Sequence, residues 1–175
     1  MRLALTLALL LASGCNDAPA DAPADAAPVP ADAAAEPAAP PADDGLPPAL
    51  ANLNLQTNHA TGSVLRVTGV RFESDHIAVD LAFTNGSDRE QKLNQYSNND
   101  FVLRDDIGNV YHLSAPPNNG DVSVPAGQSL EGEFVFLGRI NPQATALTLV
   151  TNEDYGSDTD NTRDPKMTIQ IPMTS

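Results

Sequence analysis

The sequence has a single cysteine, few basic residues and no long apolar run. Cys15 is the only cysteine among 175 residues. A disulfide within the chain, a cysteine-based zinc site and a CxxC redox pair each need at least two thiols, so all three are excluded. Only 9 Lys and Arg accompany 23 Asp and Glu, which gives a formal net charge of −14. Because nucleic-acid binding relies on cations that displace counterions from phosphates, we expect no nucleic-acid partner.

The longest apolar stretch lies at the N-terminus. No window approaches the roughly 20 consecutive apolar residues of a membrane-spanning helix, so we expect that the mature chain does not span a bilayer. Residues 1–14 instead indicate an export signal. Arg2 supplies its positive charge, Leu3 to Ala12 form a short apolar region, and the small residues that follow suit a peptidase site.

The stretch "LASGC" (11–15) resembles the lipobox of bacterial lipoproteins, with Ala12 where leucine is commonest. In that motif the cysteine carries diacylglycerol, the chain is cleaved before it and the new N-terminus is acylated. The resemblance implies lipidation of Cys15 and anchoring to a bacterial membrane, which two or more acyl chains hold stably. By the sorting rules of such lipoproteins, Asn16 favours the outer membrane. The alternative is an ordinary signal peptide cleaved near Gly14 or Cys15, which leaves a free thiol.

Residues 16–50 consist almost entirely of Ala, Pro and Asp. Proline fixes φ and removes amide donors, and too few large apolar side chains are present to offset the entropy of ordering. We therefore expect a disordered stalk, which in a polyproline-II conformation of ~3.1 Å per residue would reach roughly 100 Å. We assign residues 15–60 to the lipidated cysteine and linker, and residues 61–175 to one folded domain.

Beyond residue 60 the apolar periodicity is two, which indicates half-buried strands. Residues 76–84 and 166–171 alternate apolar and polar side chains. Residues 129–138 alternate up to an apolar run, Phe134 to Leu137, that suggests a central strand covered on both faces. Further strand candidates are 64–72, 101–104, 110–113, 121–124 and 144–150.

Turn residues such as Asn85-Gly86 and Asn119-Gly120 separate these segments, and no useful helical pattern occurs between them. Seven or eight short strands with regular turns predict an all-β, immunoglobulin-like (Ig-like) antiparallel β-sandwich. The chain has no tryptophan, so the Cys…Trp…Cys signature of antibody domains is absent.

Three stretches resemble a known family: "IAVDLAFTNGSDRE", "FVLRDDIGNVYHL" and "VPAGQSLEGEFVF". In this order and spacing they are similar to the Ig-like domain of unknown function found in many bacterial lipoproteins. That domain is related in fold to the mycobacterial immunoprotective antigen and is sometimes labelled telomeric-repeat-binding-factor-like. The resemblance covers about residues 64–150 and implies the Ig-like fold without any established catalytic residue, and fold alone does not determine function.

Residue types that often bind metals or act as nucleophiles are scattered along the sequence. His76 and His112 lie on expected strands without the helical spacing of a metal motif, and we expect them to face solvent. Ser63 lacks the G-x-S-x-G turn of a hydrolase, and the sequon at Asn85 fits a hairpin turn better than glycosylation. We therefore expect no catalytic residue, no cofactor and no metal site built from these groups. An enzyme with a site in the loops is a less favoured alternative.

The acidic loop 151–165 supports a second alternative. Calcium takes six to eight oxygen ligands, and Asp154, Asp158, Asp160 and Asp164 could begin such a shell. The ordinary interpretation of such a charge run is a solvated loop.

We favour a lipid-anchored cell-envelope protein whose domain binds or scaffolds another envelope protein. After residue 50 the chain has 16 acidic and 8 basic residues, a net charge of −8 that would steer a basic partner in a salt-dependent way. We expect contact through the loops 93–100 and 151–165, because Tyr96 and Tyr155 offer amphipathic anchors of low conformational entropy.

Overall fold

The computed structural model describes residues 45–95, 99–154 and 163–173. The expected signal segment, Cys15 and nearly all of the expected stalk lie outside these residues. Within them the chain forms ten strands and no helix, so the part described contains no helix able to cross a membrane. The all-β prediction is confirmed.

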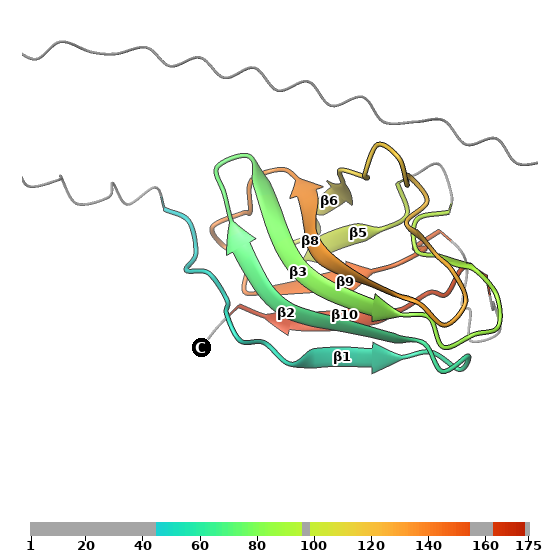
Figure 1. Cartoon of the computed structure of the whole chain (residues 1–175). Helices are drawn as coiled ribbons and strands as arrows, with labels where there is room; N and C mark the ends of the chain where they lie inside the picture. The colour runs from blue at the N-terminus through green and yellow to red at the C-terminus, as the bar shows by residue number, and fades with distance from the viewer. Residues whose placement is uncertain (1–44, 96–98, 155–162, 174–175) are drawn as a thin grey trace, which may run out of the picture. The chain divides into compact units, whose positions relative to one another are not determined.

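Eight of the strands form one antiparallel sheet in the order β1-β2-β3-β8-β6-β5-β9-β10, and β4 pairs with β7 (Figure 1). The strands are β1 (Leu55–Asn58), β2 (Val64–Phe72), β3 (His76–Thr84), β4 (Gln91–Lys92), β5 (Val102–Asp105), β6 (Val110–Leu113), β7 (Ser123–Val124), β8 (Ser129–Leu137), β9 (Ala146–Val150) and β10 (Thr168–Pro172).

The sheet curls on itself. In Figure 1, β1, β2, β3 and β8 lie in front of β5, β9 and β10. The two layers join through only two register pairs, His112 with Leu137 and Leu113 with Phe136. At the other side the edge strands β1 and β10 approach each other. The expected two sheets are therefore one antiparallel sheet that is nearly closed into a barrel.

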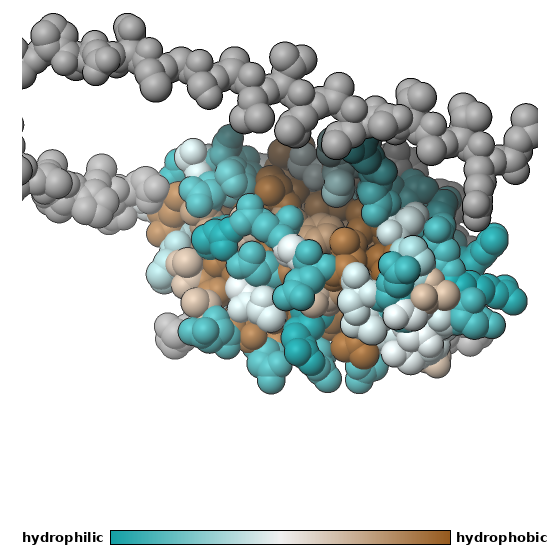
Figure 2. Space-filling model, viewed as in Figure 1, coloured by the Kyte–Doolittle hydropathy of each residue, from teal (hydrophilic) through white to brown (hydrophobic). Residues whose placement is uncertain are grey.

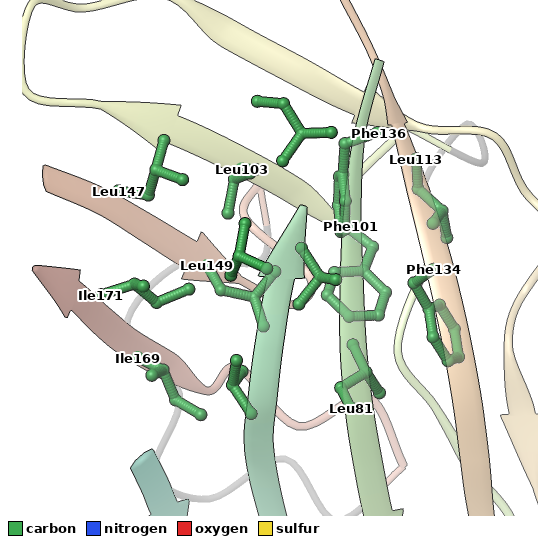
Figure 3. Packing of buried hydrophobic residues seen from close by; sticks show 14 of the residues in the cluster. Leu81, Phe101, Leu103, Leu113, Phe134, Phe136, Leu147, Leu149, Ile169 and Ile171 are labelled. Atoms are coloured by element: carbon green, nitrogen blue, oxygen red, sulfur yellow. The ribbon is translucent and has the colours of Figure 1, made fainter. Parts of the chain in front are cut away.

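The core lies between the two layers (Figure 3). Phe101 is at its centre, with its ring centroid 5.9 Å from that of Phe134 and 5.6 Å from that of Phe136. Leucine and isoleucine side chains from β3, β9 and β10 complete the cluster. The alternation predicted for residues 76–84 is confirmed, since Ile77, Val79, Leu81 and Phe83 are all buried.

The prediction that residues 134–137 are covered on both faces was wrong. Phe134 and Phe136 are buried, but Leu137 is 57% exposed because its side chain is on the outer face. The folded region also begins before residue 61. β1 pairs with β2, and Leu50 forms a bridge with Val70, because leucines in this lead-in segment pack against the core.

The β5–β6 hairpin depends on one buried carboxylate. Asp105 Oδ1 accepts hydrogen bonds from the main-chain N of Ile107 (3.1 Å) and Asn109 (2.8 Å). Its Oδ2 accepts from Asn109 Nδ2 (2.7 Å) and from the hydroxyl of Tyr111 (2.9 Å). Burial alone would raise the pKa of Asp105, but these hydrogen bonds outweigh it and hold the pKa below its ordinary value. Burial and the bond to Asp105 raise the pKa of Tyr111.

The residues after β3 form a close-packed turn. Asn85 is buried, and its Nδ2 donates to the carbonyl oxygens of Arg89 (2.7 Å) and Val124 (2.9 Å). A Cβ on Gly86 would lie 2.3 Å from the carbonyl oxygen of Gly62, so only glycine fits there. The sequon asparagine therefore has a structural role in this turn.

Candidate binding site at the loop end

The two loops predicted to contact a partner lie against each other, on the right of Figure 1. The main-chain N of Asn152 donates to the carbonyl oxygen of Leu93 (3.2 Å), and that of Lys92 donates to Arg163 (2.8 Å). Residues 59 and 71 positions apart along the chain thus form one surface. Of the predicted site residues, Tyr96, Tyr155, Asp158 and Asp160 lie outside the described residues.

Asn152 links the loops through its side chain as well. Its Nδ2 donates to the carbonyl oxygens of Lys92 (2.8 Å) and Pro165 (3.0 Å), and its Oδ1 accepts from the main-chain N of Gln95 (3.0 Å). The residue is buried and has a φ of 47°, a left-handed conformation that asparagine tolerates better than most residues. One buried amide therefore satisfies three main-chain groups, two of them in residues 92–95 and one at Pro165.

Asn94 does the same for a neighbouring loop. Its Oδ1 accepts from the main-chain N of Asp100 and of Phe101, both at 2.9 Å. Its Nδ2 donates to the carbonyl oxygen of Gly120 (2.8 Å). Because Asn94 is fully buried, these bonds fix the loop before β5 against the loop before β7.

A hollow of about 350 Å³ opens between the linked loops. It is lined by Arg89, Glu90, Lys92, Gln95, Arg163 and Asp164. Three cations and two carboxylates give this hollow a mixed charge within a strongly acidic domain. Such a lining suits a polar or charged surface of another molecule better than an apolar ligand.

Ion pairs brace the loops around the hollow. Lys92 Nζ donates to Asp121 Oδ2 (2.8 Å), and this hydrogen bond raises the pKa of Lys92 above its ordinary value. Arg104 holds Glu153 through both Nε and Nη2, the latter at 2.7 Å from Oε2. The hydrogen bonds that Arg104 donates to Glu153 raise the pKa of Arg104, and Lys166 Nζ donates to the carbonyl oxygen of Glu153. The raised pKa values keep Lys92 and Arg104 charged at neutral pH.

The acidic residues that suggested calcium are only partly described. Asp154 is exposed at a turn, whereas Asp164 is half-buried at the hollow. Among residues 45–95, 99–154 and 163–173, no three His, Cys, Asp or Glu side chains are grouped closely enough to hold a metal ion. The calcium alternative therefore gains no support from the described carboxylates.

A second buried polar cluster lies at the β1–β2 turn. Ser63 Oγ donates to Gln91 Oε1 (2.6 Å) and accepts from the main-chain N of Gly86 (3.0 Å). Thr61 Oγ1 lies 3.0 Å from both Ser63 Oγ and His59 Nδ1. Ser63 is fully buried, so its hydroxyl has no route to a substrate. Its partner is an amide oxygen rather than a base, and the arrangement joins turns instead of activating a nucleophile.

The other two histidines lie on strands, as expected. His112 is exposed, and His76 is partly exposed with its Nδ1 2.7 Å from Asp75 Oδ1. They lie on β6 and β3.

The sequence predicted contact through these two loops, which stays a prediction, but it did not single out the two asparagines that hold them together. Asn94 and Asn152 lie in stretches rich in polar residues, where several other asparagines occur. Their roles depend on main-chain groups far away along the chain. The only local signal was that asparagine is favoured where the backbone takes a positive φ, which applies to Asn152.

No family model and no curated protein matches the chain. Among solved structures it is similar to a functionally unknown protein from Listeria monocytogenes EGD-e, at 10% identity and a TM-score of 0.44, over 73% of this chain and 89% of the Listeria chain.

Proposed function

We propose that this protein is a lipid-anchored binding module of a bacterial cell envelope. In this proposal, an Ig-like domain uses its loop end to contact an envelope protein and has no catalytic role. The resemblance of "LASGC" to a lipobox supports the anchor at Cys15, and the Ala/Pro/Asp-rich segment after it suits a spacer that carries the domain away from the membrane.

The strand pairing supports the finer fold assignment. In Ig-like domains strands A, B and E pair in one layer, and strands G, F, C and C′ pair in the other. Here β2-β3-β8 follows the first order and β10-β9-β5-β6 follows the second. β1 is then an additional edge strand. This correspondence also supports membership of the Ig-like lipoprotein family whose motifs the sequence resembles.

The observation that carries the binding function is the preorganised loop end. Buried Asn94 and Asn152 fix loops from four parts of the chain, so little conformational entropy is lost when a partner binds there. The hollow between the loops presents charged side chains of both signs, such as Arg89 and Asp164, which can fix a partner's orientation. Binding sites on loops held by a rigid sheet are common in Ig-like domains.

A charge reversal tests this proposal. Arg89 lines the hollow, and its pair with Asp88 is long (3.8 Å) and exposed, so Arg89→Glu should leave stability nearly unchanged. Chemical cross-linking in native membranes should give a specific adduct with the wild type and less of it with Arg89→Glu. Arg66→Glu is the matched control, because Arg66 is exposed on β2 and does not line the hollow. Equal losses in both variants would contradict a site at the loop end.

A further inference from the structure

Strand β8 has one edge that is paired throughout and another that is mostly open. On one side β8 pairs with β3 along its whole length, from Ser129 to Leu137. On the other side β6 pairs only with Phe136 and Leu137, and the main-chain N of Ser114 donates to the carbonyl oxygen of Val135 (2.7 Å).

The register shows which main-chain groups face the open edge. The main-chain N of Asn85 donates to the carbonyl oxygen of Gln128 (2.9 Å), so even-numbered positions of β8 face β3. Odd-numbered positions face away, as the bond to Val135 confirms. The N–H and C=O groups of Glu131 and Glu133 therefore point outward. Within the part of the chain that the structure describes, neither residue makes a main-chain hydrogen bond on that side.

The sequence explains why β6 does not cover this edge. If β6 continued past Ser114 in the same register, residue 116 would pair with Glu133. Residues 116 and 117 are both proline, which has no N–H to donate to such a ladder. The chain therefore leaves β8 after Ser114, and two consecutive outward positions stay available.

We propose that an extended segment of a partner protein, with two basic residues flanking an apolar one, adds to this edge as a further strand. Main-chain hydrogen bonds to Glu131 and Glu133 would supply affinity, as in other cases of strand addition. This surface is distinct from the loop end and does not depend on the function proposed above.

Side chains along the edge define that partner chemistry. Glu131 and Glu133 are exposed on the outer face, where Figure 2 shows hydrophilic and hydrophobic residues side by side. Glu133 already pairs with Arg71, and basic residues opposite Glu131 and Glu133 would add favourable cross-strand charge pairs. Between them Gly132 has no heavy atom within 4 Å of where a Cβ would lie. An apolar side chain opposite Gly132 would fill that space beside Leu130 and Phe134, in the way that aromatic residues compensate edge glycines.

The same chemistry disfavours two other occupants. A second copy of this chain would place glutamates against glutamates, and like charges opposite each other destabilise a strand pair. The chain's own residues 16–44 are interrupted repeatedly by proline and contain no Lys or Arg, so they offer neither an unbroken series of N–H groups nor the positive charge that the edge favours.

The probe is a fluorescein-labelled peptide, Thr-Val-Lys-Phe-Lys-Val-Thr, added to the full chain in detergent; the matched control peptide has glutamate in place of both lysines. Binding is followed by fluorescence anisotropy, and amide hydrogen exchange reports the location. The basic peptide should bind, and it should slow exchange at Glu131 and Glu133, whereas Gly132 is already protected through β3. Binding without this protection, or equal binding of the acidic peptide, would overturn the proposal.

Two variants separate the contribution of the main-chain hydrogen bond to peptide affinity from that of the side-chain charge. Glu131→Pro removes an outward N–H without breaking a β3–β8 bond, and should weaken peptide binding about tenfold or more. Glu131→Gln keeps the N–H and should weaken binding only about two- to fivefold. Equal affinity of the two variants would contradict strand addition. Protection of Glu131 and Glu133 before any peptide is added would mean that a second copy or the chain's own N-terminal segment occupies the edge, and would also overturn the proposal.

Discussion

Replacing Asn152 with alanine should loosen the loop end. The change removes hydrogen bonds from Nδ2 to the carbonyl oxygens of Lys92 (2.8 Å) and Pro165 (3.0 Å), and from the main-chain N of Gln95 to Oδ1 (3.0 Å). The carbonyl of Pro165 keeps a bond from Thr151 Oγ1 (2.7 Å), so it remains satisfied. The other two main-chain groups lose the side-chain partner that the structure gives them.

The cost follows from these contacts. A net contribution of about 1 kcal/mol for each of the three hydrogen bonds gives a loss of about 3 kcal/mol in the free energy of unfolding. The left-handed backbone at φ 47° adds to this cost, because alanine is less stable than asparagine there.

Chemical denaturation of the full chain measures this loss. Asn152→Asp keeps an acceptor for Gln95 but sets a buried carboxylate oxygen against the carbonyl oxygens of Lys92 and Pro165, so it should lose at least as much stability as Asn152→Ala. Asn118→Ala is the control, since Asn118 is exposed, and it should change stability by less than about 0.5 kcal/mol. Amide exchange at Gln95 should accelerate in Asn152→Ala. A loss below about 1 kcal/mol with unchanged exchange would refute the role assigned to this residue.

Three further results are expected. Gly86→Ala should destabilise the domain by about 3 kcal/mol or more in thermal melts, because the new Cβ would lie 2.3 Å from the Gly62 carbonyl oxygen. Gly132→Ala is the control, since its Cβ would meet open space, and it should leave the melting temperature nearly unchanged. The lowered pKa of Asp105 means that its ionised form stabilises the fold above the ordinary carboxyl pKa of about 3.9, and this stabilisation is lost progressively as the pH falls from there through the lowered pKa. Asp105→Asn should therefore have a lower free energy of unfolding at pH 7. In denaturation from pH 7 to 2, that free energy should also fall less steeply than in the wild type. Fatty-acid labelling should mark the wild type but not Cys15→Ala, and an exported wild type without label would contradict lipidation.

Much of the sheet could be predicted because its strands alternate. The bounds expected for residues 64–72, 76–84 and 110–113 match β2, β3 and β6, where one face is buried. β1 was missed because its four residues follow a polar and alanine-rich stretch, and β4 because its two residues are defined only by their pairing with β7. The junction between layers could not be foreseen either, since it rests on two register pairs between β6 and β8.

The candidate site, too, could be predicted from the sequence only in part. Turn chemistry and aromatic residues indicated which loops to examine, but no local pattern indicates that Asn152 meets the carbonyl oxygen of Lys92, 60 residues earlier. The open edge of β8 could likewise not be predicted from the sequence alone. It follows from Pro116 and Pro117, whose effect appears only once β6 is known to lie beside β8.

The central claim is that the loop end is where this protein meets its partner in the cell envelope. Site-specific photo-cross-linking in native membranes tests it most directly, with a photoreactive residue at Gln95 beside the hollow or at Gln56 on β1 as the control. The account predicts a discrete adduct from position 95 that is absent from position 56 and diminished by Arg89→Glu. An adduct from position 56 with none from position 95, or the same adducts from both, would contradict it.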